Sequence, residues 1–312
     1  MNNNDIPTVT GSTSRASTCP ACGFHVAVDF FDGGKQCLST IAWPPSAAEA
    51  RNLPRLPLDF VRCVDCGHVF NISFEYSKIP YSEKPNLMFN EGASWSGFIA
   101  GIRARMLELL PPRPVVVEIG HGDGSFLASL ARGREEGRFI GFDPHGAAAG
   151  KGAVALRAEL FRPERHLEEL RPDLIITRHV LEHLIDPLGF LQQISFVARC
   201  LDVAPLAYFE VPCIDRVIET GRTSDFYYEH SSQFTTHSFT RMLQGCAADI
   251  IDVGHGYDGE VVYGFLRLGQ GAEQTRIAAE ARAFFHGARR SEDTIGRQLA
   301  EMHAAGRRVA VW

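Results

Sequence analysis

Residues 115–126 constrain the fold more than any other segment of the chain. They read VVVEIGHGDGSF, a short apolar strand that ends near Glu118 and runs into Gly120, Gly122 and Gly124. In a parallel α/β sheet, glycines at a strand-to-helix turn permit positive φ and let the backbone approach a ligand at the carboxyl edge of the strands. The segment therefore predicts the nucleotide-binding turn of a Rossmann-like α/β domain.

The glycine spacing and the nearby charges indicate which nucleotide is bound. The spacing is G-x-G-x-G, whereas the dinucleotide fingerprint G-x-G-x-x-G seats a pyrophosphate over a helix N-terminus. Glu118 and Asp123 would repel a pyrophosphate but suit the cationic amino-acid end of S-adenosylmethionine. The turn therefore favours a methyl donor over NAD, although the glycines alone are also compatible with a purely structural turn.

Two downstream segments have the same strand-then-polar-turn pattern. Residues 139–143 read FIGFD and end in Asp143, where a carboxylate can accept both ribose hydroxyls of a nucleoside. Residues 173–183 read DLIITRHVLEH, and their turn is expected to cover the cofactor. The residues expected on its methionine side, or alternatively capping the next helix, are Arg178, His179 and Val180.

The motifs EIGxGDGxFL, GFDP and HVLEH occur in this order, and through them the chain resembles the class I S-adenosylmethionine-dependent methyltransferases. The resemblance implies a Rossmann-like sheet whose last two strands form an antiparallel edge hairpin, and it adds Phe126 and Pro144 to the cofactor site. We nominate Leu160 and Phe161 for stacking on the adenine ring; the alternative is that they pack in the apolar core. Strands are expected near 115–119, 138–143, 154–157, 173–177, 206–211, 249–253 and 261–268, after a helix near 94–110.

Composition excludes several classes of protein. A chain of 312 residues with 45% hydrophobic content can bury a full core in about two domains. The net charge of −6 argues against a general nucleic-acid binder. No apolar run approaches the roughly 20 residues of a membrane span. Residues 1–17 are polar and lack the apolar region of a signal peptide, so we expect a disordered lead-in and a cytoplasmic protein. We separately expect a monomer or homodimer.

Four of the eight cysteines form two closely spaced pairs, Cys19-Pro-Ala-Cys22 and Cys63-Val-Asp-Cys66. A two-residue gap lets both sulfurs of a pair face one ion, so the pairs predict a structural Zn²⁺ site with four thiolates. The alternative is a redox dithiol, which would sit near a βαβ pattern that residues 1–80 lack. His68 is an alternative ligand, although we expect it to be a bystander.

Forty residues separate the two cysteine pairs. We therefore expect a loop or small hairpin around residues 32–34 and 43–45 to bulge from the metal domain. The predicted organisation is a lead-in (1–17), a zinc-binding domain (18–75), a linker and helix (76–114), a methyltransferase domain (115–270), and C-terminal helices with a terminal strand (271–312).

A candidate catalytic cluster follows the fifth core strand, on the same sheet edge as the cofactor turns. It comprises Tyr227, Glu229 and His230. Histidine can accept a proton at neutral pH, and a neighbouring carboxylate can orient it. We predict His230 as a general base beside Tyr227 and Glu229. The alternative is that the cluster only anchors its loop.

Several sequence features follow one another along the chain: the two cysteine pairs, EIGxGDGxFL, HVLEHxxDP, EVP and YxEHxSxF. With these features in this order, residues 18–268 resemble the nucleotide-sugar C-methyltransferases of deoxysugar biosynthesis. The resemblance implies that His230 abstracts the proton next to the ketone of a keto-deoxysugar nucleotide, and that an N-terminal tyrosine contributes. Tyr81 is the better match for it, with Tyr76 second. The resulting enolate would attack the sulfonium methyl, without a catalytic metal.

Two departures from that family bear on the acceptor. Residues 255–264 replace its HGGS-like segment, and residues 307–312 resemble the first strand of its second Rossmann-like domain. We therefore expect either a short form or fragment, or a terminal strand that pairs with another sheet edge. Three hypotheses follow: a C-methyltransferase of a nucleotide-linked sugar or related small molecule, an O- or N-methyltransferase of a natural product or other small molecule, and a non-catalytic interaction module.

Overall fold

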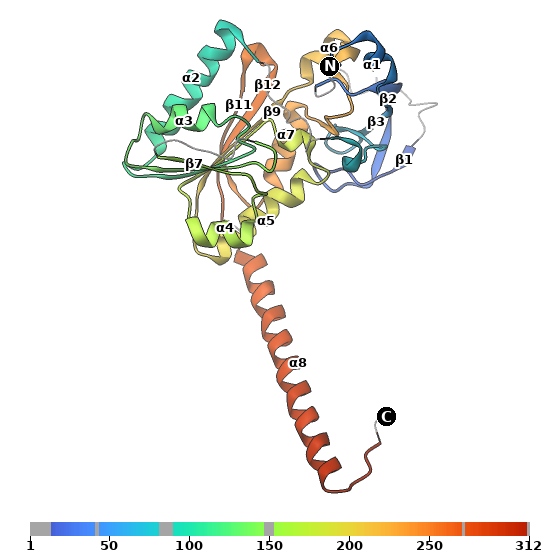
Figure 1. The fold of residues 1–312 in the computed structure, drawn as a ribbon, viewed down its shortest axis with the longest axis vertical. Helices are drawn as coiled ribbons and strands as arrows, with labels where there is room; N and C mark the ends of the chain where they lie inside the picture. Colours follow the sequence, from blue (N-terminus) through green and yellow to red (C-terminus); the bar gives the residue numbers. More distant parts are fainter. Residues whose placement is uncertain (1–13, 41–43, 81–89, 147–152, 270–271, 311–312) are drawn as a thin grey trace, which may run out of the picture. The chain divides into compact units, whose positions relative to one another are not determined.

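A computed structural model describes residues 14–40, 44–80, 90–146, 153–269 and 272–310. The chain divides into one compact unit, Met1–Gln270, and a second, Gly271–Trp312. The first unit contains two β-sheets and the helices that pack on them (Figure 1).

The larger sheet has seven strands, in the order β11-β12-β9-β8-β5-β6-β7. Five strands are parallel, and β12 runs antiparallel between β11 and β9. This confirms the predicted Rossmann-like α/β sheet with an antiparallel edge hairpin. The strands are β5 (Val115–Ile119), β6 (Arg138–Phe142), β7 (Val154–Arg157), β8 (Leu174–Arg178), β9 (Leu206–Pro212), β11 (Asp249–Gly256) and β12 (Val261–Arg267).

Helices cover both faces of this sheet, because its central strands are apolar on both sides. Successive side chains of a strand point to opposite faces, so Val116 packs in one buried cluster and Val117 in another. Figure 1 shows α2 and α3 on one side of the sheet and α4 and α5 on the other. The helices are α2 (Gly92–Leu109), α3 (Ser125–Ala131), α4 (Pro163–Leu170), α5 (Pro187–Cys200) and α7 (Thr236–Gln244).

The strand order reverses at β5, which has β6 on one side and β8 on the other. Ligands of open α/β sheets bind at such a reversal, beyond the carboxyl ends of the strands. Gly120 lies in the turn after β5 with φ 76°, and a Cβ at this position would lie 2.2 Å from Cγ2 of Val180, in the turn after β8. Glycine is therefore needed here both for its backbone conformation and for the close approach of the two turns.

The smaller sheet is antiparallel, in the order β1-β2-β3-β4-β10. Residues 32–34 do not form the expected bulging loop, because they lie inside β2, which pairs with β3 and shifts register between Asp32 and Gly34. Trp43 lies outside the described residues. The strands are β1 (Ser14–Ala16), β2 (Val26–Cys37), β3 (Arg55–Cys63), β4 (Val69–Asn71) and β10 (Ser232–Gln233), with α1 (Ala47–Asn52) between β2 and β3.

Two boundaries expected from the sequence differ in the structure. The end of the predicted lead-in forms β1, which pairs with β2. The fifth strand, β10, comes from far downstream, with Ser232 opposite Phe70 of β4. The helix α6 (Asp215–Thr220) also packs on this sheet, since Val217 belongs to the same apolar cluster as Phe60. Segments that follow β9 therefore belong physically to the N-terminal sheet.

In the second unit, residues 272–304 form one long helix, α8 (Ala272–Ala304). The expected terminal strand is not formed over residues 307–310, which have no regular structure. None of the described helices combines the length and the apolar character needed to cross a bilayer. The larger apolar side chains that α8 exposes are Ile277, Phe284, Phe285, Ile295, Leu299 and Met302.

Candidate active site

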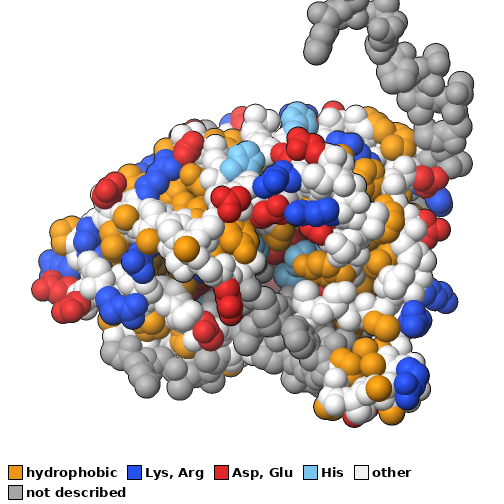
Figure 2. All heavy atoms as spheres, turned by 90° about the horizontal axis from the view of Figure 1, so that it is seen from above, with side chains coloured by type: hydrophobic (Ala, Val, Ile, Leu, Met, Phe, Trp, Pro, Cys, Tyr) orange, Lys and Arg blue, Asp and Glu red, His pale blue; other side chains and the backbone are white. Residues whose placement is uncertain are grey.

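A cavity of about 900 Å³ lies at the carboxyl edge of the large sheet. One wall, here called the strand-edge half, comes from the turns that follow β5, β6 and β7 and from residues 178–180 at the end of β8. The opposite wall, here called the histidine half, contains Thr40, Glu182, His183, Tyr227 and His230. Figure 2 shows a recess in the surface, with a histidine side chain inside it and acidic and basic side chains along its rim.

Asp143, directly after β6, is held rigidly in the strand-edge half. Its Oδ2 accepts a hydrogen bond from the backbone N–H of Gly122 (3.0 Å), and its Oδ1 accepts one from that of His145 (2.9 Å). A carboxylate oxygen can accept two hydrogen bonds. The carboxylate is therefore fixed against the glycine turn while each oxygen keeps capacity for a further donor, which suits the predicted ribose contact.

Glu118 at the end of β5 is almost fully buried, with 2% of its surface exposed. Burial raises the pKa of its carboxyl to about 8, against the opposing effect of the Arg178 guanidinium. Arg178 itself is bonded through Nε to Oε1 of Glu210 at 2.9 Å, and its guanidinium lies 4.1 Å from the ring centroid of Phe126. A buried carboxyl of this kind is a strong partner for a cationic group that enters the cavity.

The remaining residues predicted to bind the cofactor differ in their exposure and in whether they line the cavity. Leu160 is 62% exposed and Phe161 is 8% exposed, and both line the cavity. Asp123 is exposed and accepts a hydrogen bond from the N–H of Ser125 at the start of α3. Gly124 does not line the cavity; it precedes α3 with φ 74°. Lining residues shared with the prediction are Glu118, Gly120, Gly122, Asp123, Phe126, Asp143, Pro144, Leu160, Phe161, Arg178, His179 and Val180.

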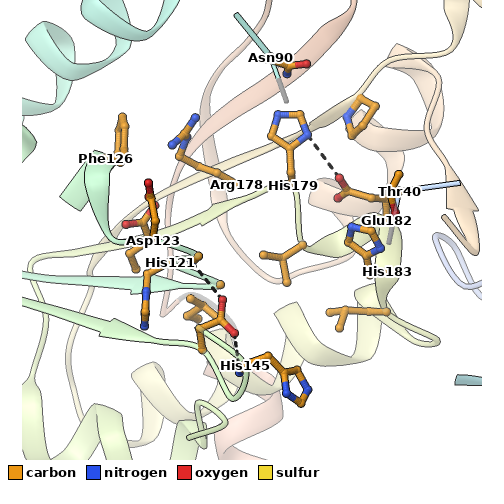
Figure 3. Close-up of a pocket in the computed structure, with 18 of the residues that line it drawn as sticks. Thr40, Asn90, His121, Asp123, Phe126, His145, Arg178, His179, Glu182 and His183 are labelled. Atoms are coloured by element: carbon orange, nitrogen blue, oxygen red, sulfur yellow. Dashed lines mark hydrogen bonds and ion pairs between the residues drawn. The ribbon is translucent and has the colours of Figure 1, made fainter. Parts of the chain in front are cut away.

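His179 bridges two buried carboxylates at the boundary between the two halves. Its Nδ1 lies 3.4 Å from Oε1 of Glu182 (Figure 3). Its Nε2 lies 3.4 Å from Oε1 of Glu210. Burial disfavours the charged ring, but the two carboxylates outweigh this and raise the pKa of His179 to about 9. The ring is therefore an imidazolium that holds the turn after β8 against β9.

The histidine half brings three aromatic side chains together. Tyr227 Oη lies 3.1 Å from Nε2 of His230, and the rings of His183 and His230 are 4.7 Å apart at 76°. Burial, helped by the neighbouring His183 and His179, lowers the pKa of His230 well below its usual value. Burial also raises the pKa of Tyr227. At neutral pH His230 is therefore a neutral imidazole beside a protonated phenol.

Glu229 does not orient His230, contrary to the prediction. Its Oε1 accepts hydrogen bonds from the backbone N–H groups of Ser39 (2.6 Å) and Thr40 (2.7 Å). The reason is local geometry: residues 227–230 form a turn, which brings its first and last side chains together and directs the middle ones elsewhere. Glu229 therefore ties this turn to the N-terminal module.

The structure places one of the two candidate tyrosines. Tyr76, in the 3₁₀ turn η1 (Tyr76–Lys78), lines the cavity, whereas Tyr81 lies outside the described residues. His183, expected to stabilise only its own turn, donates from Nδ1 to the carbonyl of Glu229 at 2.8 Å. It therefore connects the turn after β8 to the turn that contains His230.

Comparison with known proteins identifies the family. The family model described as a methyltransferase domain matches residues 93–250, which is about half of the chain. The chain belongs to this methyltransferase family. The matched residues include every strand of the strand-edge half, so the protein is an S-adenosylmethionine-dependent methyltransferase and an enzyme.

No curated protein matches the sequence. Among solved structures, a methyltransferase in complex with the Trm112 activator of Haloferax volcanii has 11% identity and a TM-score of 0.41, covering 57% of this chain and 96% of that one. Magnesium protoporphyrin IX methyltransferase of Synechocystis PCC 6803 has 12% identity and a TM-score of 0.42, covering 58% and 90%. The plantazolicin methyltransferase BpumL has 14% identity and a TM-score of 0.43, covering 57% and 85%.

The methyltransferase also contains a compact group of four cysteines in its N-terminal module. The Sγ atoms of Cys19 and Cys66 are 3.6 Å apart, those of Cys22 and Cys63 are 3.7 Å apart, and all four lie within 4.8 Å of one another. Tetrahedral zinc with Zn–S bonds of about 2.3 Å requires sulfurs about 3.8 Å apart. His68 is not in this group; it is fully buried against Phe234, with ring centroids 4.6 Å apart.

Several residues of the methyltransferase cavity were not found from the sequence. Trp95 and Tyr257 line the cavity and pack edge to face, with ring centroids 5.3 Å apart. Thr40 and Glu182 also line it. Glu182 lies within the HVLEH segment on which the family resemblance rests. That segment was the available sequence signal for its place in the cavity. Thr40 and Trp95 carried none, because their neighbours in the fold are distant in sequence.

Proposed function

We propose that this methyltransferase methylates a carbon atom next to a ketone, and that its acceptor is a keto-deoxysugar nucleotide or a related small molecule. The observation that carries the proposal is the pairing of His230 with Tyr227 on a cavity whose opposite wall is the strand-edge half. The YxEHxSxF and EVP segments support the sugar-nucleotide class through sequence resemblance. The net charge of −6 favours a small molecule over a nucleic acid.

The chemistry assigns a separate role to each group. When bound, S-adenosylmethionine would supply an electrophilic methyl group, whose S–CH₃ bond breaks so that S-adenosylhomocysteine leaves. His230 accepts the proton from the carbon next to the ketone, and the electron pair of that C–H bond forms the enolate whose carbon takes the methyl group. Tyr227 retains its own proton, and its hydroxyl shares a hydrogen bond with Nε2 of His230 that positions the imidazole. General base catalysis of this kind contributes about 10²- to 10⁴-fold to the rate.

The size of the cavity supports a reaction between two ligands. Its volume of about 900 Å³ is at the upper end of the ordinary range for ligand pockets, about 300–1,000 Å³. The strand-edge half contains the carboxylates Glu118 and Asp143, and the histidine half contains the proposed base. We therefore propose that the cofactor occupies the first half and the acceptor the second.

We also propose that Cys19, Cys22, Cys63 and Cys66 bind a structural zinc ion. The sulfur separations match a four-thiolate site, and four protein ligands leave no open position for a substrate. The ion would crosslink the turn before β2 to the turn between β3 and β4. Metal analysis of the purified protein tests this, and a zinc content well below one per chain would contradict it.

A product analysis tests the methylation chemistry. The enzyme is incubated with S-adenosylmethionine carrying a ¹³C-methyl group and with a panel of keto-deoxysugar nucleotides. We expect the label on carbon next to the ketone, identified by NMR. With S-adenosylhomocysteine in D₂O, the same acceptor should exchange the proton on that carbon. Label on oxygen or nitrogen, without such exchange, would instead support the O- or N-methyltransferase hypothesis.

A further inference from the structure

Three side chains of the histidine half have the geometry of a metal-binding triad. The ligand atoms of Glu182, His183 and His230 all lie within 4.8 Å of one another. Bonds of about 2.1 Å to a common ion allow ligand atoms up to about 4.2 Å apart, so small side-chain rotations suffice to bring all three onto one ion. Figure 3 shows Glu182 and His183 next to each other on the cavity wall.

The hydrogen bond made by His183 leaves it in the form that binds metals. A carbonyl oxygen can only accept, so the 2.8 Å contact between Nδ1 of His183 and the carbonyl of Glu229 places a proton on Nδ1. In the neutral ring the lone pair is then on Nε2. Histidine ligands of metal ions commonly donate their other ring nitrogen to a backbone carbonyl in this way, which fixes both the tautomer and the ring orientation.

Glu182 provides an independent indication of a ligand. Its side chain is 1% exposed, and neither carboxylate oxygen has a hydrogen-bond partner among the described residues. Its Oε1 lies 3.4 Å from Nδ1 of the His179 ring, which forms an ion pair with it. A buried carboxylate without hydrogen bonds is costly. A cation bound by the three side chains would interact with the carboxylate of Glu182 and complete what the ion pair with His179 provides only in part.

We propose that Glu182, His183 and His230 bind a divalent transition metal ion, and that this ion inhibits methyl transfer when it is bound. Two imidazoles and one carboxylate suit Zn²⁺, Co²⁺, Ni²⁺, Fe²⁺ or Mn²⁺, whereas Mg²⁺ and Ca²⁺ prefer oxygen ligands. Three protein ligands leave further coordination positions open to water in the cavity. The metal site is distinct from the tetrathiolate group, which shares none of its residues.

The inhibition rests on the proposed role of His230 as general base. A neutral imidazole has one lone pair, so a ring that binds the ion through it has no site left to accept a proton from the acceptor. The strand-edge half contributes none of the three ligands. Occupancy should therefore block proton abstraction and leave cofactor affinity unchanged.

Titration of the zinc-containing protein with CoCl₂ tests the binding. We expect one Co²⁺ to bind beyond the retained zinc, with weak d–d bands and without the intense thiolate charge-transfer absorption of a cysteine site. Glu182→Gln and His183→Gln should each weaken this binding at least tenfold, while the exposed His237→Gln serves as the matched control and should leave it unchanged. Absence of the additional Co²⁺, or equal binding by all variants, would overturn the metal site.

Activity and cofactor binding test the inhibition. At saturating Co²⁺, exchange of the acceptor proton in D₂O should fall at least tenfold and should recover after brief chelation that leaves the zinc content unchanged. The affinity for S-adenosylhomocysteine should stay constant. Co²⁺ binding without loss of exchange would overturn the inhibitory role. If His230→Asn retains full activity, the proposed function fails instead, and the spectroscopic titration still decides the metal site independently.

Discussion

The two halves of the cavity are built in different ways. The strand-edge half uses residues at the carboxyl ends of parallel strands in one sheet, so each side chain is positioned by the strand that it follows. The histidine half combines turns from both sheets, held by contacts such as Glu229 with Ser39, which are 190 positions apart in the chain. Under the proposed function, cofactor binding would be a property of one sheet, whereas the acceptor site would depend on how two sheets fit together. The two properties should be separable by mutation.

Substitution of the proposed base, His230, is expected to separate turnover from cofactor affinity most clearly. His230→Asn removes the proton acceptor and keeps a side chain of similar polarity, so turnover should fall about 10³-fold. Affinity for S-adenosylmethionine, measured by calorimetry, should change less than twofold, because His230 contributes nothing to the strand-edge half. The exposed His237→Gln is the control and should retain full turnover. An equal loss of cofactor affinity would show that the halves are not independent.

Loss of the proposed zinc site should also affect the histidine half more than the strand-edge half. Cys63→Ser removes one thiolate at the end of β3, next to the strand that pairs with β10. Since His230 lies two residues before β10, we expect turnover to fall about 100-fold, on the scale of misplaced catalytic groups. Zinc content, turnover and cofactor affinity are measured on the same sample. Unchanged turnover in a zinc-free sample would contradict the coupling, and Cys200→Ser is the matched control.

A substitution in the strand-edge half should have the opposite effect, lowering cofactor affinity while largely preserving turnover. Asp143→Ala removes a fixed carboxylate, so the affinity for S-adenosylmethionine should fall about 30-fold, which corresponds to about 2 kcal/mol for hydrogen bonds to a charged group. At saturating cofactor, the turnover number should stay within about threefold of that of the unmodified enzyme. The measurement is calorimetric titration together with turnover at several cofactor concentrations. A turnover number that falls as far as the affinity would indicate a role for Asp143 in the chemical step.

The smallest effect concerns the ionisation of Glu118. Burial raises the pKa of this carboxyl to about 8, so at neutral pH most of the free enzyme holds it protonated, and a cationic ligand must displace that proton. Cofactor affinity should therefore rise about eightfold between pH 6.5 and 7.5. Proton release is read from calorimetric enthalpies in buffers of different ionisation enthalpy. Glu118→Gln should flatten this pH profile, and a steep profile in that variant would assign the proton to another group.

The strand-edge half was largely predictable because its information is local. Each strand is a short apolar run, and each ends in a polar turn, so Asp143 and Glu118 could be placed at the sheet edge from the sequence. Parallel strands bring their carboxyl ends to one edge whatever their separation in the chain. Gly124 is the exception, since only the geometry of the turn determines which of three alternating glycines faces the cavity.

The histidine half was predictable in its residue types but not in its contacts. Tyr227 and His230 contact each other as expected. Glu229 instead contacts the N-terminal module, because residues 227–230 form a turn that their residue types did not predict. The pairing of β10 with β4 was also missed, since a two-residue strand carries no periodic signal. Glu182 was visible only as part of a motif, and its burial without hydrogen bonds depends on tertiary packing.

The strand β10 has a consequence for the order in which the molecule assembles. The N-terminal sheet cannot complete its fifth strand until residue 233 has left the ribosome, by which point most of the large sheet has been synthesised. Tyr228 likewise accepts a hydrogen bond from the N–H of Glu75, which is 153 positions earlier in the chain. Contacts between such distant residues carry a large loop-closure entropy and form late in folding. We therefore expect a nascent chain to form the strand-edge half of the cavity before the histidine half is complete.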